Sequence, residues 1–216
     1  MKKLSAVILL LILFISGCNK DRPETVVKDN SKEKMTIKKD TTITVRKELI
    51  TKNGKTFTII ESKPTITVSN YFVTGTGFKN SSDTITFSLL DPMLNALLAD
   101  LDNNGFEELY IITKSTGDEA FVNVMGVVSD MDERIAEIKI QQDSSMIMNK
   151  GDEFNGYLGM DSVYFDRSHL YKEYPVFKSS DPGSGNISGK VKMTYTLKNK
   201  NSEYSLDVTE KQKFPN

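Results

Sequence analysis

The chain has 216 residues and an almost balanced charge, with 28 lysines and arginines against 29 aspartates and glutamates. This balance gives no basic field of the kind that binds nucleic acid. The chain has one histidine and one cysteine, and it contains no GxSxG, HExxH or phosphate-loop motif. Aspartates and glutamates are plentiful, but no pattern pairs two of them into a glycosidase site. We therefore predict that the protein is not an enzyme and that it binds no nucleic acid.

The first 17 residues have the pattern of a secretory signal. Lys2 and Lys3 give a basic start, and the apolar run Leu4–Ile15 that follows is too short to span a bilayer, which argues against a transmembrane anchor. Two small residues lead to Cys18, and this ending resembles a bacterial lipoprotein signal. The resemblance implies cleavage before Cys18, lipid on that cysteine, and sorting to the outer membrane because Asn19 follows. The domain would face either the periplasm or the outside.

Residues 18–40 are expected to form a lipidated, flexible tether. The segment after the cysteine, NKDRPETVVKDNSKEKMTIKKD, is dense in charge and poor in large apolar residues, so it buries too little surface to offset its ordering entropy. Because the only cysteine carries lipid in this interpretation, no disulfide is available to the exported domain. About 170 residues remain, enough for one domain that buries roughly 70% of its unfolded surface.

Residues 41–216 alternate between apolar and polar side chains with a period of two. The clearest examples are Ile85–Leu89, Val191–Leu197 and Tyr204–Val208. Such alternation predicts strands with one buried and one solvated face, and Asn- and Gly-rich turn signals such as Asn53-Gly54 separate them. We predict a single all-β domain, an antiparallel sandwich or barrel. The leucine-rich segment 94–100 also fits a helix face, but we interpret it as a buried strand.

An acidic turn follows that strand. Asp100, Asp102 and Asn104 stand at relative positions one, three and five and precede Gly105, as at the start of an EF-hand calcium loop. Position twelve is Ile111, where an EF-hand needs a bidentate glutamate. The favoured interpretation is a tight turn in which Gly105 supplies a positive φ and no cofactor is bound. Calcium held by Asp100, Asp102 and Asn104 is the alternative.

Three segments of the chain occur in the same order in one known family. The first is DPMLNALLADLDNNGFEELYIITKSTG, residues 91–117, in which a strand, an acidic turn and a second strand lead to a Ser/Gly loop. The second is GYLGMD, residues 156–161, and the third is YPVF, residues 174–177, followed by Asp181. Together they resemble the periplasmic inhibitors of invertebrate-type (I-type) lysozyme, over residues 55–208. The resemblance implies a β-sandwich that inserts a loop into the lysozyme active site.

The resemblance also assigns the lysozyme-binding loop. It comprises Ser115, Gly117, Asp118, Glu119, Ala120 and Phe121. Family members carry S-G-S-Y at the last four positions, and their hydroxyls meet the catalytic carboxylates. Here Asp118 replaces the serine and Phe121 keeps the tyrosine ring without its hydroxyl. Two facing carboxylates repel by about 1 kcal/mol in water and more when desolvated, so binding requires protonation, a bridging cation or basic residues on the rim.

Two functions follow from these observations. The first is a lipid-anchored inhibitor of lysozyme or of another glycan-cleaving enzyme, which acts through residues 115–121. The second is a binding or adhesion lipoprotein that has the same sandwich without inhibitory activity, and whose binding depends on calcium. In both cases the chain is attached to a membrane through its lipid and binds a partner molecule.

Overall fold

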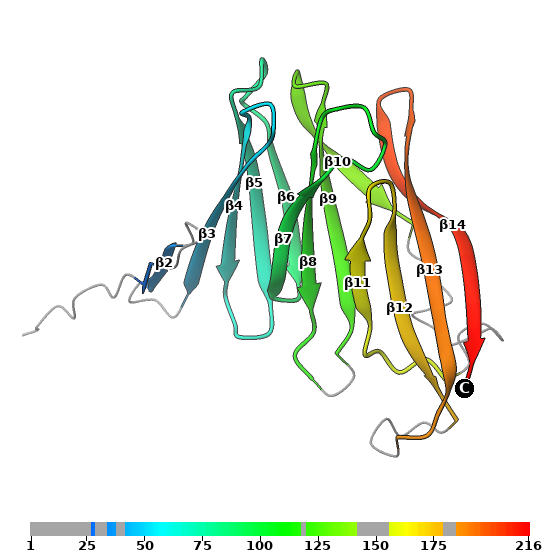
Figure 1. Ribbon diagram of the computed structural model, residues 1–216. Coiled ribbons are helices and arrows are strands. Elements are labelled where there is room, and N and C mark those ends of the chain that lie inside the picture. Colours follow the sequence, from blue (N-terminus) through cyan, green and yellow to red (C-terminus); the bar gives the residue numbers. More distant parts are fainter. Residues whose placement is uncertain (1–26, 29–33, 38–41, 118–119, 142–155, 179–184) are drawn as a thin grey trace, which may run out of the picture.

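The computed structural model describes residues 27–28, 34–37, 42–117, 120–141, 156–178 and 185–216. All regular elements in these ranges are strands, which confirms the prediction of an antiparallel all-β sandwich (Figure 1). No helix in these ranges is long and apolar enough to cross a membrane. The predicted signal peptide and Cys18 lie outside the described residues.

The first sheet has six strands that follow chain order and pair antiparallel. They are β1 (Val27–Lys28), β2 (Lys34–Ile37), β3 (Ile43–Ile50), β4 (Thr56–Lys63), β5 (Ser69–Thr76) and β6 (Thr84–Leu90). The strands β1 and β2 lie within the range predicted to be a tether. In β2, Met35 is paired with Val45 of β3, so this part of the range extends the sheet.

The second sheet has eight strands in the order β11-β12-β13-β14-β10-β9-β8-β7. They are β7 (Met93–Ala99), β8 (Glu108–Lys114), β9 (Val122–Asp130), β10 (Arg134–Ile140), β11 (Ser162–Phe165), β12 (Leu170–Phe177), β13 (Ile187–Lys200) and β14 (Glu203–Pro215). All pairs are antiparallel except β10–β14, where Ile138 pairs in parallel with Tyr204. The leucine-rich segment is a strand as predicted, but it is only partly buried. Ala96 is 6% exposed, whereas Leu94 of this edge strand is 58% exposed.

The central strands of the second sheet are buried on both faces. In β8, Leu109 belongs to one hydrophobic cluster and the adjacent Tyr110 to another, because neighbouring side chains in a strand point to opposite faces. The inter-sheet core is formed by Phe57, Ile59, Tyr71, Val73, Phe78, Ala96, Leu109, Ile111, Met125, Val127 and Ile135. The hairpin core is formed by Leu101, Tyr110, Val128, Ile138, Tyr157, Leu170, Tyr174, Val191, Met193, Tyr195, Leu197, Tyr204 and Leu206.

Strand directions separate the two sequence-predicted sites. Because β8 runs antiparallel to β7 and β9, residues 115–121 and the corner at residues 91–92 lie at one end of the sandwich, the loop end. The acidic turn, residues 100–108, lies at the other end, the turn end, together with the turn between β9 and β10. Figure 1 shows the loop after β8 at the bottom of the molecule and the β9–β10 turn at the top.

Candidate functional site

The loop 115–121 is closed at its base by two reciprocal hydrogen bonds. The backbone N–H of Ser115 donates to the carbonyl of Phe121 at 2.8 Å, and the N–H of Phe121 donates to Ser115 Oγ at 2.7 Å. Ala120 has a φ of 43°, which is left-handed backbone. The side chains of Asp118 and Glu119 lie outside the described residues. The base of the loop is therefore ordered by the loop's own atoms.

The ring of Phe121 turns toward the protein interior. It is partly buried against the hairpin core, and its centroid lies 5.8 Å from that of Tyr157. The contact of Phe121 with lysozyme stays a prediction. Replacing Phe121 with a small residue would move the loop as well as remove a contact, so another residue is a better probe of binding.

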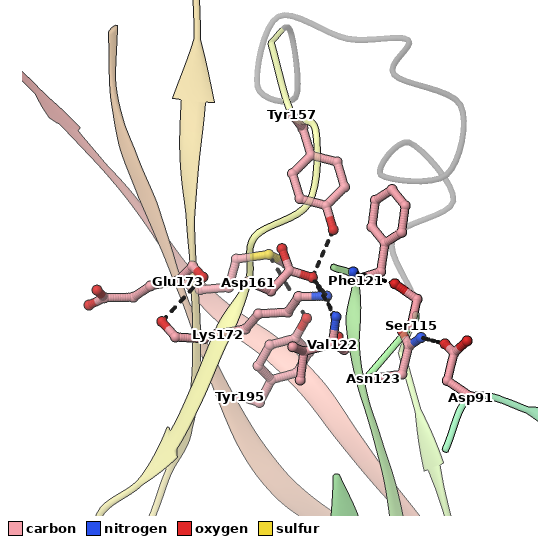
Figure 2. A network of polar contacts seen from close by, with 12 residues as sticks. Asp91, Ser115, Phe121, Val122, Asn123, Tyr157, Asp161, Lys172, Glu173 and Tyr195 are labelled. Carbon is pink, nitrogen blue, oxygen red and sulfur yellow. Dashed lines mark hydrogen bonds and ion pairs between the residues drawn. The ribbon is translucent and has the colours of Figure 1, made fainter. Parts of the chain in front are cut away.

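A buried ion pair holds the first residue of β9 beside the loop (Figure 2). The Oδ2 atom of Asp161 accepts hydrogen bonds from Val122 N–H at 3.1 Å, Tyr157 O–H at 2.9 Å and Lys172 Nζ at 2.9 Å. Lys172 Nζ also donates to the Val122 carbonyl at 2.9 Å. The side chain of Asp161 is 0% exposed and that of Lys172 is 12% exposed. Both backbone groups of Val122 are thus bound by one charged pair, which we call the clamp.

The electrostatics of the clamp favour a fixed geometry. Burial, and then the charge of Asp161, raises the pKa of the Tyr157 phenol, so this group stays neutral and donates its proton to the carboxylate. The second oxygen of Asp161, Oδ1, is buried without a hydrogen-bond partner among the described residues. A buried carboxylate in this state depends on Lys172, because removing one partner of a buried pair leaves an uncompensated charge.

The GYLGMD segment supplies Asp161 of the clamp and Tyr157, which donates a hydrogen bond to it. Gly156 has a φ of 85°, and a Cβ atom there would lie 2.2 Å from the carbonyl oxygen of Phe177, so only glycine fits. The Gly156 carbonyl accepts the N–H of Phe177 at 2.8 Å, and Tyr157 forms a bridge with Val176. Sequence reasoning identified this segment by resemblance alone and missed its role as part of the clamp.

At the turn end, the three residues predicted to bind calcium come together. Asp100 accepts hydrogen bonds from the backbone of Asn104 and Gly105, each at 3.0 Å. Asp102 accepts one from the Asn104 side chain at 2.9 Å, and Asn104 Oδ1 accepts one from the N–H of Phe106 at 2.7 Å. Gly105 has a φ of 86°. These bonds are those of a tight turn, as the favoured interpretation predicted.

The structure adds Glu108 to this group. One carboxylate oxygen each of Asp100, Asp102 and Glu108 lies within 4.8 Å of the others, and Glu108 is 1% exposed. Burial, together with the charges of Asp102 and Asp100, raises the pKa of Glu108 to about 8, and burial also raises that of Asp102. Among the described residues, no lysine or arginine forms an ion pair with Asp100, Asp102 or Glu108.

A cation would suit the chemistry of this group. Calcium prefers six to eight oxygen ligands, and Glu108 stands at position nine counted from Asp100, which is also a ligand position in the EF-hand loop. Glu108 was not among the predicted calcium ligands, which were Asp100, Asp102 and Asn104. Its place in the group follows from the strand direction, which turns the Glu108 side chain back under the acidic turn, where its Oε2 atom accepts the N–H of Leu101 at 2.9 Å.

No family model matches this chain, and no curated protein or solved structure matches it either.

Proposed function

We propose that the protein is a lipid-anchored envelope protein that binds and inhibits I-type lysozyme through the loop 115–121. The observation that carries this proposal is the bracing of the loop. Its base is closed by Ser115 and Phe121, and the clamp of Asp161 and Lys172 holds Val122 directly after it. A loop that is already ordered at its base loses less conformational entropy when a partner binds, which favours affinity. The segment order described above supports lysozyme as the partner.

The altered loop chemistry requires a particular mode of contact. Because carboxylates would repel the catalytic carboxylates of a glycan-cleaving enzyme, Asp118 and Glu119 would pair with basic residues on the rim of the cleft. Rim pairs of this kind raise the association rate and are screened by salt. The proposal therefore implies inhibition that weakens as the ionic strength rises.

The test is a titration of the full chain, kept in mild detergent, against I-type lysozyme while cell-wall lysis is followed. A chicken-type lysozyme serves as the comparison enzyme. We expect loss of I-type activity near one-to-one, weaker inhibition at high salt, and weaker inhibition by the isosteric double variant Asp118→Asn, Glu119→Gln. Full lytic activity at micromolar protein would overturn the proposal.

A second candidate function is binding to an envelope partner in a calcium-dependent way. The specific observation in its favour is the group of Asp100, Asp102 and Glu108. Their carboxylate oxygens lie within 4.8 Å of one another, and none of the three is paired with a lysine or arginine of the described residues. In this candidate, calcium would order the turn end and present it to a partner. Thermal unfolding of the full chain with calcium and with chelator tests it, and identical melting temperatures would exclude it.

A further inference from the structure

The outer face of the strands β11, β12 and β13 carries a cluster of aromatic and charged side chains. These residues alternate along each strand with residues that pack against or belong to the hairpin core, so they point to the opposite side of the sheet. The cluster, which we call the tyrosine face, comprises Tyr164, Tyr171, Glu173, Lys190 and Lys192. The clamp lies on the other side of β12, so the tyrosine face is separate from the loop 115–121.

The two tyrosine rings are held in place by hydrogen bonds. Tyr164 of β11 lies directly opposite Tyr171 of β12, and the ring centroids are 5.0 Å apart with the planes at 27°. The hydroxyl of Tyr164 donates to Glu173 Oε1 at 2.7 Å, and that of Tyr171 donates to Asp166 Oδ2 at 2.6 Å. The bond from Tyr171 is the main cause that lowers the pKa of Asp166 to about 2, so this acceptor stays ionised. Rings fixed in this way lose little conformational entropy when a ligand binds.

The rings form a platform, and Lys192 covers one half of it. Lys192 Nζ lies 3.9 Å from the Tyr171 centroid and 5.6 Å from the Tyr164 centroid. With the 5.0 Å between the rings, these distances form a triangle with nearly a right angle at Tyr171, so the two nearly parallel rings lie side by side beneath the ammonium. The strand β11 is at the edge of the sheet, and Tyr164 is 39% exposed. The Tyr164 ring is therefore the open half of the platform.

Charges of both signs border this ring. Lys190 pairs with Glu173 at 3.1 Å, and hydrogen bonds from Tyr164 and Lys190 lower the pKa of Glu173. Among the described residues, no carboxylate forms an ion pair with Lys192. An exposed aromatic ring thus has ammonium donors and a carboxylate acceptor beside it, without an excess of either sign.

We infer that the tyrosine face is a binding site for a neutral glycan. One face of a pyranose ring consists of C–H groups that pack on an aromatic ring, and its hydroxyls both donate and accept hydrogen bonds. Tyr164 would supply the ring, Lys192 a donor and Glu173 an acceptor. The mixed charges are complementary to a polar, uncharged molecule and not to a polymer of one charge sign. The inference goes beyond the proposed function and does not depend on lysozyme.

The experiment titrates the full chain, in mild detergent, with the neutral tetrasaccharides chitotetraose, cellotetraose and maltotetraose, and follows binding by calorimetry. We expect at least one of them to bind. Tyr164→Leu, which removes the ring and keeps an apolar side chain, should weaken this binding about tenfold. Tyr164→Phe keeps the ring without the hydroxyl and should bind as the wild type does. Phe72→Leu is the matched control, because Phe72 is 38% exposed but lies on β5 of the other sheet, and it should leave the affinity unchanged.

Several outcomes would overturn the inference. They are the failure of all the neutral sugars to bind at millimolar concentration, tighter binding of the acidic tetragalacturonate, and equal losses of affinity in Tyr164→Leu and Phe72→Leu. If Tyr164→Leu does not fold, the ring protons of Tyr164 in the wild type decide by nuclear magnetic resonance, and they must shift during the titration. Because no lysozyme is present, a failure here leaves the proposed function standing, and a failure of lysozyme inhibition leaves this inference standing.

Discussion

Asp161 at the loop end and Glu108 at the turn end are both buried carboxylates, but their surroundings have opposite charge. Asp161 has Lys172 at 2.9 Å and two further donors on the same oxygen. Glu108 faces Asp100 and Asp102, and its pKa is raised to about 8. Burial penalises a carboxylate in both places, and the structure compensates it with a lysine at one end only. The loop end is therefore built for a fixed geometry, whereas the turn end should respond to protons and cations.

The largest effect should come from breaking the clamp. Lys172→Met removes one partner of a buried pair, so we expect the free energy of unfolding to fall by about 3–5 kcal/mol, measured by urea denaturation. Lys190→Met is the matched control, because Lys190 pairs with Glu173 on the same sheet but is 51% exposed, and its loss should cost less than about 1 kcal/mol. Equal losses in the two variants would show that the clamp is not special.

Calcium should act on the opposite end. At a concentration one hundred times its dissociation constant, calcium should stabilise the fold by about 2.7 kcal/mol, because it would bind the assembled carboxylates and not the unfolded chain. Glu108→Gln should abolish most of this gain, and Lys172→Met should leave it intact. A calcium response that survives in Glu108→Gln would place the cation elsewhere.

The pH dependence should also arise at the turn end. The pKa of Glu108 is raised from 4.5 to about 8 by folding, so between these values the folded chain holds a proton that the unfolded chain has released. In chelator, the contribution of this group to stability is therefore fully present below pH 4.5 and lost as the pH rises to about 8, by about 1.4 kcal/mol per pH unit.

The difference in the free energy of unfolding between the wild type and Glu108→Gln isolates the contribution of Glu108, since all other titrating groups contribute equally to both proteins. Denaturation series from pH 4 to pH 9 measure it. A difference that stays constant over this range would mean that folding leaves the pKa of Glu108 unchanged.

The smallest effect should come from opening the base of the loop. Ser115→Ala removes the acceptor for the Phe121 N–H, and one lost hydrogen bond should lower the free energy of unfolding by about 1 kcal/mol. The control is Ser162→Ala, whose hydroxyl makes only a long, exposed contact with the Glu173 carbonyl at 3.5 Å. If lysozyme affinity falls only in Ser115→Ala, the order of the loop base matters for binding; if it falls in neither, the bracing argument loses its support.

Local patterns predicted most of the strands correctly. The alternation of Val191, Met193 and Tyr195 places these side chains on one face of β13, and all three are buried. The Asn53-Gly54 signal marks a turn in which Gly54 has a φ of 76°. Both follow from the backbone geometry of a few adjacent residues, which the sequence encodes directly. Leu94 shows the limit, because its exposure depends on β7 being at the edge of the sheet.

The sequence by itself determined the strand periodicity, the acidic turn and the position of the loop between two strands. The tertiary structure alone decided that Asp161 and Lys172 would meet at Val122, and that Glu108 would join Asp100 and Asp102. It also placed the loop and the acidic turn at opposite ends. The reason is that these contacts depend on strand order and register, which arise from packing over the whole chain, and no local pattern of side chains records them.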